Sequence, residues 1–527
     1  MAVLTKYDIT GIQNFIFNSQ KLMENIGASN IIHDVLHKLL PEALGEGLEE
    51  QVVLIDWKNN TQFGIKNRHD IKAEIVYIGG GNAIVVYRDR EIEKQITKSF
   101  YRKVFENAYT LHVVSASIDT NLENFRNDME YLKKELSINK QKHIKSHPLY
   151  GIAITKLDSH TGLPIALLKD NTQNISIDRI LKRTAVRYNE TLKYIDNISE
   201  YTFPKEFDHL GRSHNESSFI GVVHIDGNGM AKYFHGETLK SAEGYEESIL
   251  QLRNLSIQID NIYKNAFAHL TAIIEKNINQ FEEKGLNLAY DKEAKKKYLP
   301  IRPIIINGDD ITFVCDGRIA LSAAEKFLKY INEVDYTQFG MEDKLSACGG
   351  VAIVKSHFPF STAYGIAEEC CASAKSKSRE LCTDNQIKSW LDYQVCFSGI
   401  IGNLDSVRDD MYKVKDYNLL WRPWLIGTFE NDLNNENDLN FECFKRIYHN
   451  FSDSSKWPRN KIKELRNAFL KGKEEVQEVL SENESRGRNL INPFSDVDKK
   501  SEGFIGNSTP YFDVLELMDM YIDLKEV

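Results

Sequence analysis

The chain has 527 residues, of which 42% are hydrophobic and 27% charged, an ordinary composition for a globular protein. Its net charge of −10 argues against a protein that binds nucleic acid through an overall positive surface. No apolar run reaches the ~18 residues of a membrane helix, no signal peptide is visible, and the seven cysteines form no C-x-x-C pair. We therefore expect a cytoplasmic protein of roughly three to four domains, with no membrane contact, disulfide framework or zinc finger.

The first predicted unit begins with a strand that ends at Asp8, followed by Gly11 and a helical pattern. Apolar residues recur at three- and four-residue steps between residues 31 and 40, which predicts an amphipathic helix. The pair His33-Asp34 in this helix looks like part of a metal-dependent phosphohydrolase site. The periodicity places both side chains on the polar face, however, and no second histidine cluster follows, so we do not predict a nuclease site.

A hairpin is predicted at residues 73–87, where two β-rich runs flank the turn Gly79-Gly80-Gly81-Asn82. His69-Asp70 precedes this hairpin in a polar stretch and is expected to be solvated.

The same order of elements recurs from residue 218. A β-rich run ends at Asp226 and continues into Gly227-Asn228-Gly229, a helical pattern spans residues 252–273, and a second hairpin turns through Asn307-Gly308-Asp309-Asp310. This repeat predicts an α+β fold with two copies of one module, residues 1–200 and 218–400, joined by a linker at 201–217. Residues 401–527 are expected to form a helical C-terminal domain.

Two adjacent aspartates in a hairpin turn point to a metal site. Neighbouring carboxylates repel each other, and aspartate is disfavoured in strands, although Asn-Gly alone is a strong hairpin signal. Bound Mg²⁺ or Mn²⁺ removes the repulsion because hard divalent ions prefer carboxylate oxygens. We therefore predict that Asp226, Asp309 and Asp310 hold two divalent ions and catalyse phosphoryl or nucleotidyl transfer on a nucleoside triphosphate.

Backbone and lysine groups are expected to contact the nucleotide. The turn residues Gly227, Asn228 and Gly229 follow the first strand, and Asn307 and Gly308 precede the acids, so both turns would let backbone N–H groups approach phosphates. Lys375 lies at the edge of the apolar face of a predicted helix; it would place a positive charge on the triphosphate, although a lysine near a helix C-terminus also simply complements the dipole.

The first copy lacks the acids of the second. Its turn, Gly79-Gly80-Gly81-Asn82, has no carboxylate where the second copy has Asp309 and Asp310. We expect the first copy to be non-catalytic, with its glycines close to a second nucleotide and facing the one active centre.

The sequence resembles the large polymerase-cyclase subunit of type III CRISPR effectors over about residues 1–400. The matching stretches are Asp8-Ile9-x-Gly11-Ile12-Gln13-x-Phe15-Ile16-Phe17, Gly27-Ala28-Ser29, Asn307-Gly308-Asp309-Asp310 in place of a Gly-Gly-Asp-Asp motif, Ser346-Ala347-Cys348-Gly349-Gly350-Val351-Ala352, His357, Pro359 and Ala372-Ser373-Ala374-Lys375. The resemblance implies two ferredoxin-like palm domains packed as a pseudo-dimer. It also implies that ATP is converted into cyclic oligoadenylates that activate a downstream effector, and that small CRISPR subunits with guide and target RNA are partners.

The resemblance is incomplete in three respects. Asn307 replaces the first glycine of the motif, no N-terminal HD nuclease domain precedes the first palm-like stretch, and the zinc-binding cysteines often found between the palms are absent. Two other functions remain open: a non-catalytic scaffold or RNA-binding subunit, and a stand-alone cyclic-dinucleotide synthase of the GGDEF type. The pairing of two unequal modules in one chain favours the interpretation as a CRISPR polymerase-cyclase subunit over a cyclic-dinucleotide synthase. GGDEF enzymes usually form dimers of two identical catalytic domains.

Overall fold

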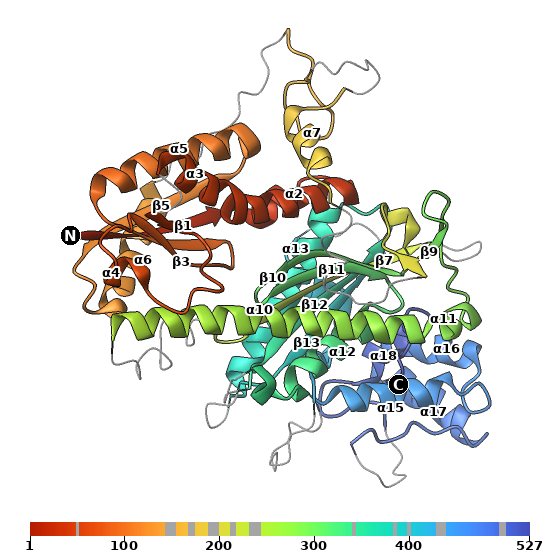
Figure 1. The fold of residues 1–527 in the computed structure, drawn as a ribbon. Helices are drawn as coiled ribbons and strands as arrows, with labels where there is room; N and C mark the ends of the chain where they lie inside the picture. Colours follow the sequence, from red (N-terminus) through yellow and green to blue (C-terminus); the bar gives the residue numbers. More distant parts are fainter. Residues whose placement is uncertain are drawn as a thin grey trace.

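The computed structural model describes residues 1–48, 52–142, 154–166, 174–187, 200–210, 218–230, 244–339, 344–382, 387–397, 402–427, 439–494 and 502–526. These residues form a mixed α and β chain with several sheets (Figure 1). No helix among them is long and apolar enough to cross a membrane.

The first large sheet has five strands in the order β2-β3-β4-β1-β5, antiparallel except for the β2–β3 pair. Its strands are β1 (Ala2–Thr10), β2 (Val53–Leu54), β3 (Ala73–Gly79), β4 (Asn82–Tyr87) and β5 (His112–Thr120). The helices of this half are α1 (Ile12–Phe17), α2 (Leu22–Asp34), α3 (Leu40–Gly47), α4 (Gly64–Asn67), α5 (Arg90–Ala108) and α6 (Phe125–Lys142), with a π-helical turn at Val35–Leu39 between α2 and α3.

The second large sheet has six strands in the order β10-β11-β7-β12-β13-β16. Its strands are β7 (Phe219–Gly227), β10 (Ile301–Asn307), β11 (Asp310–Asp316), β12 (Ala347–Lys355), β13 (Trp390–Cys396) and β16 (Trp424–Leu425). Its helices are α10 (Tyr245–Lys276), α11 (Ile278–Glu283), α12 (Ala320–Glu333) and α13 (Phe360–Glu380).

The predicted repeat is visible in the strand order. The segments β3-β4-β1-β5 and β10-β11-β7-β12 run in the same antiparallel order, with helices between corresponding strands. Asp8 pairs with Asn82 in the first sheet where Asp226 pairs with Asp310 in the second. Even the register shift in each hairpin falls at the same place, after Ile75 and after Pro303. One supersecondary unit therefore occurs twice.

Helix α10 ties the two halves together, running along both sheets in Figure 1. Its residue Arg253 is buried against the first half and donates hydrogen bonds to the carboxylate of Glu74 at 2.9 Å and to the carbonyl of Val76 at 2.8 Å. A second contact joins α1 to α13, where the rings of Phe17 and Tyr364 stack with centroids 4.0 Å apart. One hydrophobic core cluster accordingly draws residues from both sheets.

The C-terminal segment is mainly helical and packs beside the second sheet (Figure 1). Its elements are α14 (Leu404–Tyr412), the short strands β14 (Lys413–Val414) and β15 (Tyr417–Asn418), α15 (Phe441–Ser452), α16 (Arg459–Phe469), α17 (Lys473–Glu484) and α18 (Tyr511–Leu517). Its strand β16 extends the six-stranded sheet through β13. The fully buried Arg422 pairs with Asp513 and Glu516 of α18, which fixes that helix to the sheet edge.

The region between the halves carries α7 (Ile177–Thr184), β6 (Tyr201–Thr202) and a 3-10 turn at Phe207–His209. Strand β6 forms a small sheet with β8 (Tyr290–Asp291) and β9 (Lys296–Tyr298). The expected linker at 201–217 thus contains ordered elements up to residue 210, and residues 211–217 lie outside the described part of the chain.

Candidate active site

Three predicted acids meet at the ends of neighbouring strands. Asp226 near the end of β7 lies directly opposite Asp310, the first residue of β11. Asp309 precedes it in the turn, and its carboxylate packs over the backbone of Gly227: a Cβ at Gly227 would lie 2.9 Å from Asp309 Oδ2. Gly308 adopts φ +62°, a left-handed conformation that glycine adopts without strain, so the turn brings both acids to one end of the sheet.

Burial and neighbouring carboxylates raise the pKa of Asp309 and of Asp310. Burial, followed by repulsion from Asp226, raises the pKa of Asp309 to about 6. Burial, followed by repulsion from Asp226, Asp309 and Glu368, raises the pKa of Asp310 to about 8. Such shifts indicate that the ionised carboxylates are unfavourable in this site unless a positive charge compensates them.

Lys375 supplies part of that charge. Its Nζ lies 2.5 Å from Asp226 Oδ2 and 3.1 Å from the Gly227 carbonyl oxygen. The predicted site lysine therefore reaches the site from α13, and its partner is a carboxylate that is itself a predicted metal ligand.

The sequence did not predict three further side chains that lie near the acids. Glu368 lies two turns before Lys375 on α13, and its pKa is raised by burial and by its acidic neighbours. Tyr364 is buried beside the acids with no hydrogen-bond partner for its hydroxyl, and His224 Nδ1 lies 3.6 Å from Asp310 Oδ1. The seven-residue spacing of Glu368 and Lys375 on one helix face was the signal that could have revealed the glutamate.

The donor set fits a hard divalent cation, because it consists of carboxylates. Within the described residues, no three His, Cys, Asp or Glu side chains surround a single point as a preassembled metal centre would. In this structure Lys375 Nζ lies 2.5 Å from Asp226 Oδ2, a carboxylate oxygen that a bound cation would share.

We expect Asp309 and Asp310 to destabilise the metal-free protein increasingly as pH rises from about 4 to about 8, whereas the buried His37 and His224, whose pKa values are lowered to about 4, act in the opposite direction up to about pH 6.5. The pKa values of Asp309 and Asp310, about 6 and about 8, exceed the unfolded value of 3.8, so these two groups bind more protons in the folded state than in the unfolded state throughout this window. Thermal unfolding at pH 8 should show a Tm higher by about 2 °C or more in the Asp309→Asn/Asp310→Asn variant. Adding Mn²⁺ should raise the wild-type Tm at pH 8 more than at pH 5. The variant keeps His37 and His224, so the Tm difference between variant and wild type isolates the two acids. A difference that does not grow between pH 5 and pH 8 would contradict the electrostatic description.

Replacing Gly227 with alanine should disable the site without unfolding the protein. The added methyl would sit 2.9 Å from both Cβ and Oδ2 of Asp309 and 2.7 Å from the methyl of Met230, so the Asp309 carboxylate must move. We expect Mn²⁺ affinity, measured by calorimetry, to fall about 10-fold or more. Gly45→Ala is the matched control, because nothing lies within 4 Å of its added Cβ; equal affinity in both variants would show that the Asp309 position is unimportant.

The predicted nucleotide-binding residues Asn228 and Gly229 lie in the turn that follows β7. Gly229 adopts φ +65° just after β7, whereas the Asn228 amide is buried and donates to Ser346 Oγ at 3.1 Å and to the Lys388 carbonyl at 3.3 Å. In this structure Asn228 holds the turn together and does not project into open space.

A cavity of about 590 Å³ lies between the halves. Asn307, Gly308 and Asp309 line one side, and Gly79, Gly80 and Asn82 of the first half line another. Gly81 does not line it; a Cβ there would meet Ile12 Cδ1 at 2.6 Å. The two hairpin turns thus face one shared space, as expected, while Asp226, Asp310 and Lys375 lie outside its lining with Asp309 between them and the cavity.

The first half keeps part of the same arrangement. Asp8 pairs with Lys140 Nζ at 2.6 Å, from the helix that follows β5, as Asp226 pairs with Lys375 from the helix that follows β12. Asn82 stands where Asp310 stands in the second half. The correspondence of Lys140 and Lys375 becomes visible only in three dimensions.

His33 and His37 lie on the polar helix face that the periodicity predicts, and both also line the cavity, with His33 exposed and His37 half-buried. The sequence did not predict that residues from the second half of the chain line the same cavity. His69 and Asp70 are exposed, and Asp70 pairs with Arg68, as expected of a solvated stretch.

No family model and no curated protein matches the sequence. Solved structures match nearly the whole chain. An apo Csm1-Csm4 cassette matches at a TM-score of 0.52 with 14% identity, covering 99% of this chain and 70% of that chain. A Csm1-Csm4 cassette in complex with cA4 matches at 0.51, with 14% identity and the same coverages, and one in complex with AMPPNP matches at 0.50, with 15% identity, covering 98% and 69%.

These likenesses establish the class of fold: a mixed α and β chain of the kind found in the Csm1-Csm4 cassette. The fold of these Csm1-Csm4 neighbours agrees with the CRISPR resemblance found in the sequence.

Proposed function

We propose that this chain is a type III CRISPR subunit that joins ATP into cyclic or linear oligoadenylates. The observation that carries the proposal is the meeting of Asp226, Asp309 and Asp310 at adjacent strand ends, with Lys375 against them and Asp309 facing the shared cavity. The neighbours solved with cA4 and with AMPPNP support nucleotides as ligands.

In this proposal the two repeated units are palm domains packed as a pseudo-dimer. Residues 1–200 form a non-catalytic palm, 201–217 the linker, 218–400 the catalytic palm, and 401–527 the C-terminal domain. The shared strand order and the facing turns support this division. The single active centre lies in the second palm, because the first has Gly81 and Asn82 where the second has Asp309 and Asp310.

Asp226, Asp309 and Asp310 would hold two Mg²⁺ or Mn²⁺ ions, which when bound activate the attacking hydroxyl and stabilise the leaving pyrophosphate. The protein groups position the substrate. Lys375 moves from Asp226 to a phosphate oxygen once Asp226 is occupied by a ligand, and Gly308 lets the ribose and phosphates approach the backbone. The new bond joins a 3′ oxygen to the α-phosphorus of a second ATP, and the bond from that phosphorus to pyrophosphate breaks.

The test is pyrophosphate release by the purified protein with ATP and Mn²⁺ or Mg²⁺, followed by mass spectrometry of the products. Cyclic or linear oligoadenylates support the proposal, and a cyclic dinucleotide as the only product would favour the stand-alone synthase.

A scaffold role is the second candidate. The Csm1-Csm4 neighbours are two-protein cassettes, which supports CRISPR partner subunits for this chain. Guide and target RNA are further partners that the sequence resemblance implies. A chain that co-purifies with such partners but releases no pyrophosphate would be a scaffold alone.

A further inference from the structure

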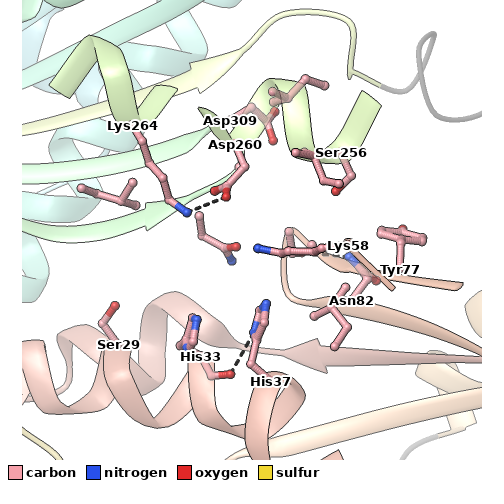
Figure 2. A pocket seen from close by; sticks show the side chains of 18 of the residues that line it. Ser29, His33, His37, Lys58, Tyr77, Asn82, Ser256, Asp260, Lys264 and Asp309 are labelled. Atoms are coloured by element: carbon pink, nitrogen blue, oxygen red, sulfur yellow. Dashed lines mark hydrogen bonds and ion pairs between the residues drawn. The ribbon is translucent and has the colours of Figure 1, made fainter. Parts of the chain in front are cut away.

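The two cavity-lining histidines are held in a fixed arrangement. The rings of His33 and His37 stack with centroids 4.1 Å apart and planes within 3°. They lie four residues apart, at the junction of α2 with the π-helical turn Val35–Leu39. Figure 2 shows both rings pointing from this helix into the cavity, toward the side that carries Asp260, Lys264 and Asp309. Single π-helical turns within α-helices are frequent at functional sites.

The hydrogen bond within the pair determines which nitrogen of His37 carries the proton. His37 Nδ1 lies 3.1 Å from the backbone carbonyl oxygen of His33. Because a carbonyl only accepts, Nδ1 must be the donor. Burial lowers the pKa of His37 to about 4, so the ring is neutral at pH 7 and Nε2 is a hydrogen-bond acceptor. No described residue bonds to Nε2.

A second acceptor on the same lining, Asn82 Oδ1, is out of reach of a ligand. The amide of Asn82 is oriented by its own turn, because Nδ2 donates to the Gly80 carbonyl at 2.8 Å. Its Oδ1 has no hydrogen-bond partner but is itself buried, so a ligand in the cavity does not reach it. His37 Nε2 is therefore the acceptor on which a bound base would depend.

Two other uses of the histidine pair fit the geometry less well. Histidines four residues apart on a helix can bind zinc, but parallel stacked rings do not direct two nitrogens at one ion, and the described residues provide no group of three ligands. A phosphate site needs donors, whereas neutral His37 presents an acceptor.

We infer that His37 reads the nucleobase: its Nε2 accepts a hydrogen bond from the exocyclic amino group of an adenine bound in the shared cavity, with His33 holding the ring in place. The inference rests on the proposed function, which places the triphosphate near Asp309 on the other side of the same cavity. A base with a carbonyl at that position, such as hypoxanthine, would set two acceptors against each other. His37 is thus a specificity-determining residue, not a catalytic one.

The test compares binding of ATP and ITP by the full chain, through competition with a fluorescent ATP analogue in Ca²⁺. We expect wild type to bind ATP about 10-fold or more tightly than ITP, since a mismatched acceptor leaves a polar group unpaired. His37→Phe keeps a stacking ring but has no acceptor, so its ATP-to-ITP preference should fall to within about 2-fold. His37→Gln should bind both nucleotides, because its amide can turn to offer either a donor or an acceptor. His69→Phe, on an exposed histidine outside the cavity, should behave as wild type.

The outcomes separate this inference from the proposed function. If wild type binds ATP and ITP equally, or His37→Phe keeps the preference, the base is not read by His37, while metal-dependent binding through Asp309 still stands. If wild type binds neither nucleotide, both the inference and the proposed function are wrong. Unfolding of His37→Phe is recognised by its Tm, and His37→Gln then decides the question.

Discussion

Replacing both Asp309 and Asp310 with alanine should reduce pyrophosphate release from ATP by about 1000-fold or more, to background. Both carboxylates lie at the strand ends where Asp226 and Lys375 converge, and without them only Asp226 of the three proposed ligands remains, which is too few to hold two ions. The variant should remain folded, with a Tm at pH 8 equal to or above that of wild type, because the change removes two carboxylates whose pKa values are raised by burial and neighbouring carboxylates.

The matched control is Asp409→Ala/Asp410→Ala, an adjacent aspartate pair exposed on α14. It should leave turnover unchanged. Turnover that survives the Asp309/Asp310 change would place the chemistry elsewhere, and a large drop in Tm would show that these acids stabilise the fold.

Arg253→Met should cost about 3–5 kcal/mol of folding free energy. The arginine is 2% exposed, and the change leaves the buried Glu74 carboxylate without its cation and several carbonyls of residues 60–76 without donors. Because α10 carries Ser256 and Asp260 to the cavity, activity should also fall as the helix loosens from the first half. Denaturant unfolding measures the first effect and pyrophosphate release the second.

A double-mutant cycle distinguishes the ion pair from a general packing defect. Adding Glu74→Gln to Arg253→Met should recover part of the lost stability, since it removes the unpaired buried charge. Arg68→Met breaks an exposed pair with Asp70 and should have no measurable effect. A wild-type-like Arg253→Met protein would show that the arginine and its hydrogen bonds contribute little to holding the halves together, which other contacts such as Tyr245 with Asp128 would then account for.

The repeat and the acids were predictable from the sequence because both are local signals. Each strand, turn and helix of the repeat has its own periodicity, and acids at strand ends must meet when the strands pair, as Asp226 and Asp310 do. The repeat also predicted that the Gly79–Asn82 turn would face the active centre of the second copy, and residues of both turns line one cavity.

Other parts of the site depend on packing that no local pattern encodes. Helical periodicity placed His33 and His37 on a polar face, but it did not show that this face lines a cavity shared with α10, more than 200 residues away in sequence. Lys140 and Arg253 look like ordinary surface cations in sequence, and only the assembled fold gives them buried carboxylate partners. Asn228 differs in the opposite way. The sequence predicted that it contacts phosphate, whereas in the structure its amide is buried and hydrogen-bonded to Ser346 and to the Lys388 carbonyl, which stabilises the turn.

Pyrophosphate release from ATP by the purified chain tests the central claim most directly, with Mn²⁺ present and with partner subunits and target RNA added. The proposal predicts metal-dependent release together with oligoadenylates of more than two units in the product. Absence of turnover with every nucleoside triphosphate, even in the assembled complex, would contradict it.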